Sequence, residues 1–401
     1  MDKNPFQEAS EIIERLEKEG YEAYFVGGCV RDLLLQRKIE DIDIATSASP
    51  PIVQQTFQTV IPVGIEHGTV IVRHKGKSYE VTTFRRDGSY SDQRHPDEVT
   101  FVNDIAEDMK RRDFTINALA LDKEGKLIDL FQGEKDLEKK VIRSVGDAKK
   151  RFQEDPLRII RALRFASQLG FSIEKDTLEQ MMLLNKEIET VAVERLTNEF
   201  TKFFQGEFLE IGFSYLLQMK GYRHIPILNK NEHLIEKVPR PLSAFYSFSE
   251  VIALFHYLDS DIAINDWVKE WKCSNQVKAE AINLFQCIKR YEETGIDSWL
   301  IYRLDRSLIR AFSHLAVLVF RDDSKLQANR LSKEKDALPI QSRKDLHING
   351  HDLIDLFPNK KQGPWMNEII EQIEYKVVMG QLANDNDTIK EWIICHPPAI
   401  N

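Results

Sequence analysis

The sequence predicts a mixed α/β head followed by a long, helical remainder. Up to about residue 130, short strand-like runs alternate with glycine turns and short helical stretches, as in a mixed sheet. From Lys135 onward, apolar residues recur every three or four positions and strand signals nearly vanish. The 401 residues exceed the size at which one hydrophobic core usually stops growing, so we expect two or more packed units.

The composition is ordinary for a helix-rich globular protein, with 42% hydrophobic and 30% charged residues. The polar N-terminus lacks the basic head, apolar run and cleavage site of a signal peptide. No stretch of about 18 apolar residues is present to span a bilayer. The four cysteines are scattered, without a metal or disulfide motif. We expect a cytoplasmic protein that does not bind membranes, and no protein partner is evident.

The formal net charge of −9 argues against a protein that coats nucleic acid through bulk positive charge. Any RNA would have to meet a local basic patch. One candidate runs from Lys139 to Arg164, where nine lysines and arginines face three acidic residues. We expect RNA contact to concentrate there.

Five segments of the head carry clear secondary-structure signals, and everything up to about residue 130 is expected to be mixed α/β. They are a strand at 21–28 that ends in a glycine turn, a helix at 29–36, a strand at 41–46, a hairpin at 68–84 that turns near Lys75 and Gly76, and a strand at 98–102.

In the strand at 41–46, Asp41 and Asp43 fall on one face because side chains alternate along a strand. Two adjacent carboxylates repel unless cations join them, and a pair of Mg²⁺ ions would do so in a two-metal site for phosphoryl transfer. The alternative is two solvated acids on an exposed strand, which is the commoner case for an isolated Asp-x-Asp motif. The neighbouring motifs decide between these interpretations.

Gly27 and Gly28 form a turn between the first predicted strand and helix, 13 residues before Asp41. Glycines there let backbone N–H groups approach an anion, and the helix start adds positive partial charge. Arg31, one turn into the helix, is suited to hold a triphosphate oxygen. Alone this motif is more often a tight turn, but the aspartates that follow favour phosphate binding.

Two further motifs extend the candidate site. Glu80, on the second strand of the hairpin, is the natural third carboxylate of a two-metal site, although a surface glutamate is an equal alternative. The run RRDFTIN at 111–117 brings Arg112 and its neighbours to what we interpret as a helix start, suited to a triphosphate and ribose hydroxyls. The alternative is a solvated basic turn with Asp113 as a helix N-cap.

The most basic helix opens at Asp155-Pro156, and Arg158, Arg161 and Arg164 follow at intervals of three on one broad face. An arginine beside an aspartate can imitate a base. It offers donors to N3 and O2 of cytosine or N1 of adenine, and an acceptor to the amino group of either. Asp155 alone equally fits an N-cap before proline, but that interpretation does not explain the three arginines.

Residues 84–96 form a long polar loop between two predicted strands. Loops of this length in compact domains are mobile lids or disordered segments. The arginine, aspartate and tyrosine residues of this loop favour a lid near the nucleotide.

Six motifs occur in the order found in nucleotidyltransferases of the polymerase-β superfamily: GGCVRD, DIDIAT, HGTVIV, YEVTTFR, RRDFTINA and EDPLRIIRALRFA. The sequence resembles bacterial class II CCA-adding enzymes, strongly over about the first 165 residues and by general helical character beyond. The resemblance implies a polymerase-β-like head and template-independent addition of C, C and A to the 3′ end of tRNA. The substrates would be CTP and ATP, the released product pyrophosphate and the cofactor Mg²⁺.

The resemblance also implies a catalytic head at 1–138, a nucleotide-recognising neck at 139–207, and tRNA-binding body and tail domains at 208–298 and 299–401. The loop at 84–96 resembles the family's flexible loop, associated with the switch from C to A addition. The implied site residues are Asp41 and Asp43 for metal, Gly28 and Arg31 for phosphates, Arg112 for ribose or phosphate, and Asp155, Arg158, Arg161 and Arg164 for the nucleotide, with Asp155 and Arg158 templating the base.

Two alternatives remain open. A poly(A) polymerase, or a partial enzyme that adds only CC or only A, shares the head. The loop at 84–96 argues against a CC-only enzyme, and HGTVIV lacks the basic stretch associated with bacterial poly(A) polymerases. The other alternative is a non-catalytic RNA-binding protein, against which the two aspartates and the basic neck argue.

Overall fold

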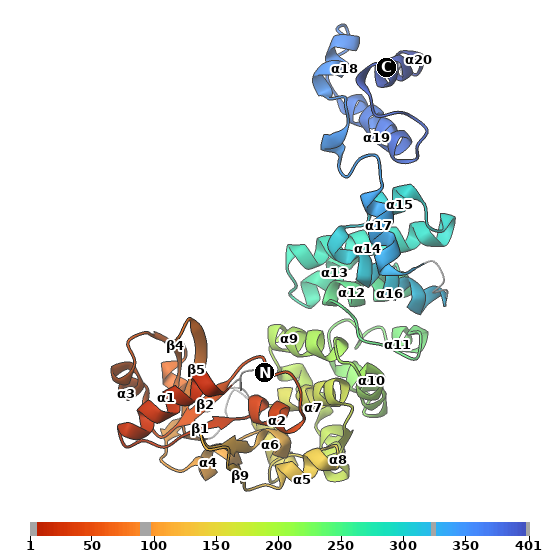
Figure 1. Cartoon of the computed structure of the whole chain (residues 1–401). Coiled ribbons are helices and arrows are strands. Elements are labelled where there is room, and N and C mark those ends of the chain that lie inside the picture. Colours follow the sequence, from red (N-terminus) through yellow and green to blue (C-terminus); the bar gives the residue numbers. More distant parts are fainter. Residues whose placement is uncertain (1–5, 89–97, 322–325, 398–401) are drawn as a thin grey trace. The chain divides into compact units, whose positions relative to one another are not determined.

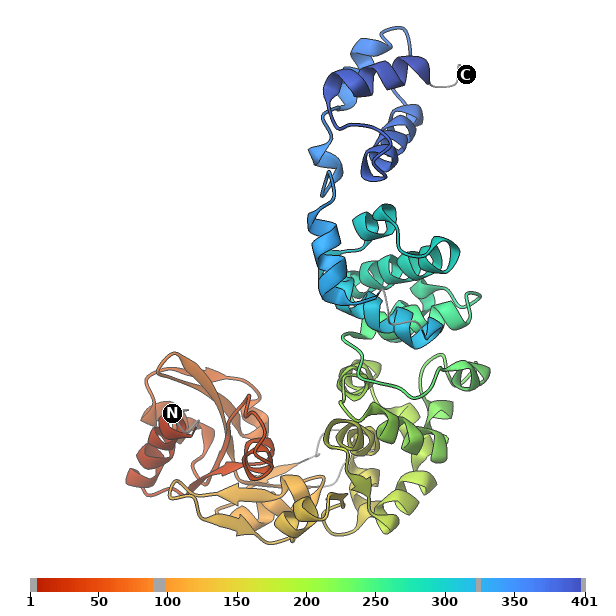
Figure 2. The same cartoon turned by 45° about the vertical axis from the view of Figure 1, so that its right-hand side comes forward.

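The computed structural model describes residues 6–88, 98–321 and 326–397. It divides into two compact units, Met1–Ile235 and Glu236–Asn401. The first unit holds the α/β head and the first helices of the remainder, whereas the described part of the second contains only helices and connecting loops (Figures 1 and 2). The predicted fold class is confirmed.

A seven-stranded mixed sheet forms the head, with the order β3-β4-β5-β2-β1-β8-β9. Among the described pairings of this sheet, only β2 and β5 run parallel. The strands are β1 Ala23–Val26, β2 Asp43–Thr46, β3 Val60–Pro62, β4 Thr69–His74, β5 Lys77–Thr83, β8 Leu119–Leu121 and β9 Leu127–Asp129. Strands β6 (Arg85–Asp87) and β7 (Val99–Phe101) pair with each other in a separate two-stranded sheet.

Helices cover the head sheet and close its core. Helix α1 packs against β1 and β4 through its apolar stripe, in which Ile12, Ile13 and Leu16 are fully buried. Phe25 of β1 and Ile44 of β2 are buried as well. The helices of the head are α1 Gln7–Lys18, α2 Gly28–Leu34, α3 Pro50–Thr56, α4 Ile105–Lys110 and α5 Gly133–Glu138.

The predicted hairpin is present as β4 and β5, and it turns at Lys75 and Gly76. Both residues have positive φ, as a two-residue hairpin turn that matches the strand twist requires. Strands β3, β8 and β9 were not predicted. Each has three residues, and those of β8 are all buried, so no alternation marks it in the sequence.

The helical part of the first unit is built around α7, which has eleven buried residues out of thirteen. Two short strands, β10 (Val141–Ile142) and β11 (Ser172–Ile173), pair in parallel within this region, which was predicted to be entirely helical. The helices are α6 Ala148–Glu154, α7 Leu157–Leu169, α8 Lys175–Leu183, α9 Val193–Phe204, α10 Leu209–Gln218 and α11 His233–Lys237.

Two glycines let α7 lie close to its neighbours α9 and α10. A Cβ at Gly206 would lie 2.5 Å from the carbonyl carbon and oxygen of Ser167, and one at Gly212 would lie 2.9 Å from the carbonyl oxygen of Leu163. Both contacts involve the backbone of α7 and cannot be relieved by a side-chain rotation. This close approach fixes α7 in place.

The second unit is built from helices α12 to α20. Its C-terminal helices enclose a separate hydrophobic cluster that includes Leu353, Ile373 and Ile389. No helix within the described ranges is long and apolar enough to cross a membrane. The helices are α12 Phe248–Leu258, α13 Ile264–Glu270, α14 Asn275–Thr294, α15 Ser298–Arg303, α16 Ile309–Phe320, α17 Ala328–Asp336, α18 Gly350–Leu356, α19 Pro364–Val378 and α20 Asn386–Cys395.

The contact at Gly206 makes a stability prediction. Replacing Gly206 with Ala should destabilise the protein by about 2 kcal/mol, because the added methyl group meets the backbone of α7. Gly350→Ala is the control, since its Cβ would meet only the end of Met366, at 3.5 Å. Urea unfolding followed by circular dichroism measures both variants. Equal midpoints for the two would contradict the predicted clash.

Candidate nucleotide-binding and catalytic site

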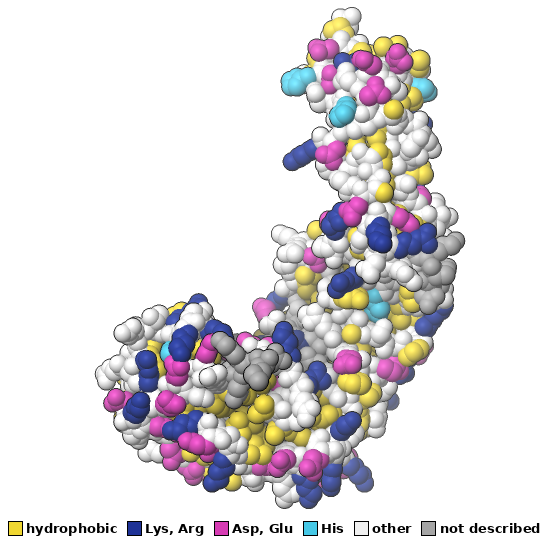
Figure 3. All heavy atoms as spheres, viewed as in Figure 1, with side chains coloured by type: hydrophobic (Ala, Val, Ile, Leu, Met, Phe, Trp, Pro, Cys, Tyr) yellow, Lys and Arg dark blue, Asp and Glu magenta, His cyan; other side chains and the backbone are white. Residues whose placement is uncertain are grey.

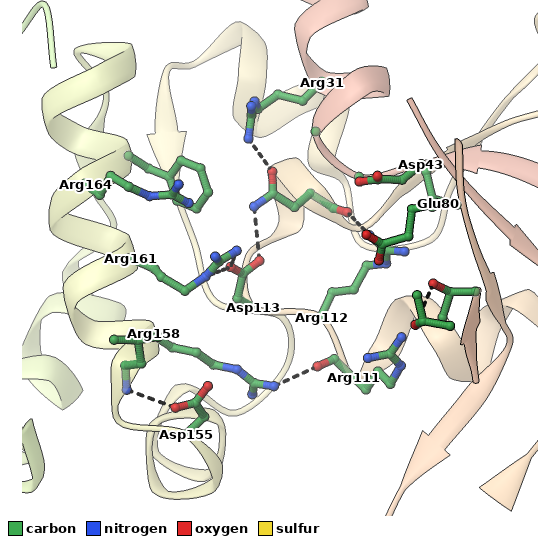
Figure 4. A pocket seen from close by; sticks show the side chains of 18 of the residues that line it. Arg31, Asp43, Glu80, Arg111, Arg112, Asp113, Asp155, Arg158, Arg161 and Arg164 are labelled. Carbon is green, nitrogen blue, oxygen red and sulfur yellow. Dashed lines mark hydrogen bonds and ion pairs between the residues drawn. The ribbon is translucent and has the colours of Figure 1, made fainter. Parts of the chain in front are cut away.

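One cavity of about 690 Å³ lies in the first unit between the head sheet and helix α7 (Figure 4). Nine of the ten predicted site residues line it, and Asp41 is the exception. Its walls carry twice as many arginines as carboxylates, which suits a polyanionic ligand. These residues are Arg31, Arg85, Arg111, Arg112, Arg158, Arg161, Arg164 and Arg195, and Asp43, Glu80, Asp113 and Asp155.

Asp43 and Glu80 lie side by side on one wall of the cavity. They are directly paired in the parallel register of β2 and β5, so the sheet itself sets their spacing. Burial, followed by the charge of Glu80, raises the pKa of Asp43 to about 6, and the nearby Arg112 only partly opposes this. This wall therefore carries negative charge that the protein does not fully neutralise.

Asp41 lies outside the strand, because β2 begins at Asp43 rather than at residue 41 as predicted. It is exposed, although its charge still acts on Asp43. No three His, Cys, Asp or Glu side chains form a metal centre in the part of the chain that the structure describes. The carboxylate oxygens of Asp43 and Glu80 nevertheless fit a hard divalent cation, which would neutralise their repulsion.

The turn before α2 forms the second wall. Gly27 has a φ of +73°, and a Cβ there would lie 2.8 Å from Nη1 of Arg112, so glycine leaves room for that guanidinium. Arg31 donates from Nη1 to Oδ1 of Asn117 at 2.7 Å and is also paired with Asp32. Its guanidinium lies 5.2 Å from the ring centre of Phe165 on α7. Arg31 therefore faces the cavity in a fixed position.

The segment at 111–117 does not start an α-helix, and that prediction was wrong. Helix α4 ends at Lys110, and the chain continues into a single 3₁₀ turn before β8. Arg112 donates to Asp108 and to the carbonyl of Asn117, while its buried Nε has no hydrogen-bond partner within the described part of the chain. That donor suits a ligand oxygen.

Asp113 is buried rather than solvated, so the alternative of a surface N-cap does not hold. Its carboxylate accepts from Nε of Arg161 at 2.7 Å, from Nδ2 of Asn117 at 3.1 Å and from the N–H of Phe114 at 2.8 Å. Burial alone would raise its pKa, but the charge of Arg161 and the hydrogen bonds from Asn117 and Arg161 hold the pKa well below its usual range. Asp113 thus links the head to α7.

Asp155 and Arg158 line the cavity but are not paired with each other. The carboxylate of Asp155 accepts hydrogen bonds from Nη1 and Nη2 of Arg195, at 3.2 and 2.8 Å. It also accepts the backbone N–H of Leu157 at the start of α7. Arg158 donates to Glu154 at 3.0 Å and to the carbonyl of Arg111 at 3.1 Å. Arg195 was not predicted, because it lies 40 residues from Asp155 and no local motif marks it.

Arg161 and Arg164 are held by Glu199 of α9, which the sequence analysis also missed. Oxygens of Glu199 lie 3.5 Å from Nη1 of Arg161 and 2.9 Å from Nε of Arg164. Burial, followed by the charge of Arg161, lowers the pKa of Arg164 to about 10. Its guanidinium lies 4.4 Å from the ring centre of Phe165. The three predicted arginines therefore reach the cavity as an ordered set.

The predicted basic patch at 139–164 separates into two parts. The lysines at 139, 140, 149 and 150 are exposed, whereas Arg158 and Arg164 are buried in the wall of the cavity. Figure 3 shows basic and acidic side chains interspersed over the face that it draws, in keeping with the net charge of −9. The positive charge of the site is thus mostly internal.

The predicted lid at 84–96 falls largely on residues 89–97, which lie outside the described residues. Its base is the β6–β7 pair, in which β7 falls on the strand predicted at 98–102, whereas β6 was predicted to be part of the loop. Within β6, Arg85 lines the cavity and pairs with Asp87 at 3.1 Å, and Asp87 lies 3.7 Å from Arg111. The base of the segment is therefore part of the cavity wall.

Comparisons with known proteins agree with this geometry. The family model of the poly(A) polymerase head domain matches residues 23–143, and a model of the probable RNA- and SrmB-binding site of polymerase A matches 170–239. A model of tRNA nucleotidyltransferase domain 2 matches residues 245–393. The fold and the carboxylate- and arginine-lined cavity define the chain as a nucleotidyltransferase.

Relatives that match nearly the whole chain identify the kind of nucleotidyltransferase. A CCA-adding enzyme of Oceanobacillus iheyensis is 50% identical over 99% of both chains, and one of Bacillus cereus is 39% identical over 97% of this chain and 98% of the relative. The crystal structure of the Bacillus stearothermophilus CCA-adding enzyme in complex with CTP is 36% identical and covers 98% of both chains with a TM-score of 0.88. The chain belongs to the family of CCA-adding enzymes, nucleotidyltransferases that complete the 3′ end of tRNA with the help of a divalent metal ion.

The raised pKa of Asp43 predicts that ionising this side chain lowers the free energy of unfolding of the metal-free protein. Because its folded pKa of about 6 exceeds the ordinary aspartate value of 3.8, this cost develops as the pH rises from about 4 and is complete above about 6. Asp43→Asn should therefore be more stable than the parent at pH 7.5 in EDTA, by on the order of 2 kcal/mol after allowance for solvent screening.

Urea unfolding at pH 7.5 and pH 4.5 measures this difference, which should shrink at the lower pH. Adding a divalent cation at pH 7.5 should stabilise the parent and leave Asp43→Asn nearly unchanged. A parent more stable than the variant in EDTA at pH 7.5 would contradict the assigned cost.

Proposed function

We propose that this cavity binds CTP and then ATP, and that the 3′-hydroxyl of tRNA attacks the α-phosphate with release of pyrophosphate. The observation that carries the proposal is one cavity in which the Asp43–Glu80 pair faces the arginines of α7. Carboxylates on one wall suit metal-assisted phosphoryl transfer, and arginines on the other suit a triphosphate and a base. The solved relative in complex with CTP supports the same ligand class.

We propose Mg²⁺ as the metal, held by Asp41 and Asp43 with Glu80 as a further catalytic carboxylate. When bound, the metal supplies positive charge that favours the deprotonated hydroxyl and offsets the charge of the leaving pyrophosphate. Asp43 is fixed by β2, whereas Asp41 lies before the strand and would have to turn toward the metal. The uncompensated charge of Asp43 supports this assignment.

The triphosphate and ribose are assigned to the turn and to the segment after α4. The backbone N–H of Gly28 and the guanidinium of Arg31 contact the phosphates, and the free Nε of Arg112 contacts ribose or phosphate. Arg31 is held by Asn117 and is stacked near Phe165, so little side-chain entropy is lost on binding.

The base is assigned to Asp155, Arg158, Arg161 and Arg164. The carboxylate of Asp155 would accept from the amino group of cytosine or adenine, and Arg158 would donate to the ring nitrogen and carbonyl edge. Uracil and guanine present the opposite pattern and leave buried groups without partners. Since Arg195 holds Asp155 by two contacts, the carboxylate keeps its plane while the base is exchanged.

The domain assignment remains a proposal, with a head at 1–138, a neck at 139–207, a body at 208–298 and a tail at 299–401. We assign tRNA binding to the body and tail, supported by the match of tRNA nucleotidyltransferase domain 2 to residues 245–393. Cytoplasmic location is proposed from the same tRNA substrate.

The primary test supplies a tRNA transcript that ends at the discriminator base, with magnesium and CTP, ATP or both. Products are resolved to single nucleotides. Two additions with CTP alone and three with both substrates are expected. A long ladder with ATP would indicate a poly(A) polymerase, fewer additions a partial enzyme, and no extension a non-catalytic binding protein.

The metal assignment predicts that Asp41→Ala and Asp43→Asn each lower kcat at least about 1,000-fold while tRNA affinity changes less than about twofold. Each variant removes one metal ligand and leaves the RNA-binding helices untouched. Single-turnover extension and filter binding measure the two effects. A parallel loss of tRNA binding would argue against a purely catalytic role.

The base assignment predicts that Arg158→Ala raises misincorporation of UTP and GTP relative to CTP and ATP by about tenfold or more, because the donors to the base edge are lost. Arg158→Lys keeps the positive charge but lacks the two parallel N–H donors of the guanidinium. It should recover nucleotide binding but little of the selectivity for CTP and ATP. Competitive incorporation at equal nucleotide concentrations measures the ratio. Parent-like rejection of UTP and GTP by Arg158→Ala would refute the assignment.

A further inference from the structure

A second cavity of about 360 Å³ lies wholly within the second unit and contains none of the residues used above. Helices α14, α15 and α19 form it together with the 3₁₀ turn Arg343–Asp345, and α15 packs against both α14 and α19. The lining combines an aromatic wall with charged groups: Gln286, Cys287, Arg290, Trp299, Leu300, Arg303, Arg343, Glu371 and Glu374. This size is within the range of small-ligand sites.

Trp299 provides the aromatic wall and is held on two sides. Its ring is stacked on Tyr302 with centres 5.4 Å apart, and the ring of Tyr375 meets it edge-on at 5.2 Å. The indole also packs against the hydrophobic cluster of the C-terminal helices. Trp299 is therefore a fixed flat surface at the edge of a cavity, which is what stacking of a nucleobase requires.

The other two cations of the cavity already have anionic partners. Arg290 is bonded to Asp297 through two nitrogens, one contact measuring 3.1 Å. Arg343 is bonded to Glu374 at 2.8 and 3.0 Å, and Tyr302 donates to the same carboxylate. Glu371, the remaining carboxylate of the lining, also lies 3.5 Å from Arg343. These groups shape the walls and contribute no net positive charge.

Arg303 differs from both. Its side chain is paired with no carboxylate of the described chain, and it is exposed at the cavity. Among the described residues, the only aromatic ring that the Arg303 guanidinium contacts is that of Trp299. The guanidinium carbon lies 5.9 Å from the centre of this ring. This distance is at the outer limit of a cation–π contact, so the guanidinium is loosely held. An unpaired arginine beside a fixed indole suits a planar group that carries an anion.

We infer that this cavity binds one unstacked nucleotide of the RNA substrate, with the base against Trp299 and a phosphate on Arg303. The inference rests on the proposed tRNA substrate and adds a nucleotide-binding site separate from the catalytic cavity. Single-stranded or looped RNA exposes bases that stack on aromatic rings and arginine planes, whereas paired RNA does not. A bare inorganic anion would leave the indole wall unused.

The test uses the full-length protein and the tRNA transcript that ends at the discriminator base. Arg303→Ala should weaken tRNA binding about fivefold and reduce the slope of log Kd against log salt by about one, because one phosphate contact is lost. Trp299→Leu should weaken binding about tenfold and leave the slope unchanged, since stacking carries no charge. The kcat and the KM for CTP should stay at the parent values in both.

Arg310→Ala is the matched control, because Arg310 is an exposed arginine of α16 that does not line the cavity. It should change tRNA affinity less than about twofold. Trp299→Phe is a second control, which tests whether the loss of binding in Trp299→Leu reflects lost stacking rather than misfolding. It keeps an aromatic surface and should retain most of the affinity, with an unchanged melting curve.

Equal losses for Arg303→Ala and Arg310→Ala would overturn the inference in favour of a diffuse charge effect. Parent-like binding by Arg303→Ala and Trp299→Leu, in protein that still extends tRNA, would overturn it and leave the proposed function intact. A parent that neither binds nor extends tRNA would overturn both. Equilibrium dialysis with CTP separates a free nucleotide from RNA: a second CTP site that Arg303→Ala abolishes would overturn the RNA assignment.

Discussion

The ion pair between the buried Asp113 and Arg161 is the contact on which the rest of the site depends. Asp113 belongs to the head and Arg161 to α7, so the pair fixes one wall of the cavity against the other. Asn117 extends the contact to Arg31, and Glu199 extends it to Arg164. Removing Arg161 would leave the buried carboxylate of Asp113 without its cationic partner, a change that typically costs about 3–5 kcal/mol.

This network explains how so many arginines occupy one cavity. Each of Arg161, Arg164 and Arg195 is paired with a carboxylate, which limits their mutual repulsion while leaving guanidinium edges exposed to the cavity. The walls are therefore ordered before a nucleotide arrives, and binding requires little rearrangement of charged groups. The acidic partners come from the head, from the residues just before α7 and from α9, so the head sheet and the helices around α7 are joined by one network of ion pairs.

The sequence predicted the α/β head, the hairpin turn and most of the charged residues that line the cavity, because each depends on local patterns. Glycines before a helix, alternating Asp43 and Ile44, and arginines at intervals of three are all readable within one element. Arg195 and Glu199 were missed because their partners come from distant segments and only the tertiary fold brings them together. The segment after Lys110 was misread as a helix start, since its polar residues serve a buried junction rather than a cap.

The pairing of β5 with two neighbours has a consequence for how the protein tolerates change. Glu80 sits on a strand bonded to β4 on one edge and to β2 on the other. A residue inserted or deleted within β5 would exchange the two faces of the strand, carrying Glu80 into the core and Val81 into the cavity. The hairpin tip at Lys75 and Gly76 bears no such constraint. Variation in length among descendants of this gene should therefore collect at the tip, while the strand beside it stays fixed in length.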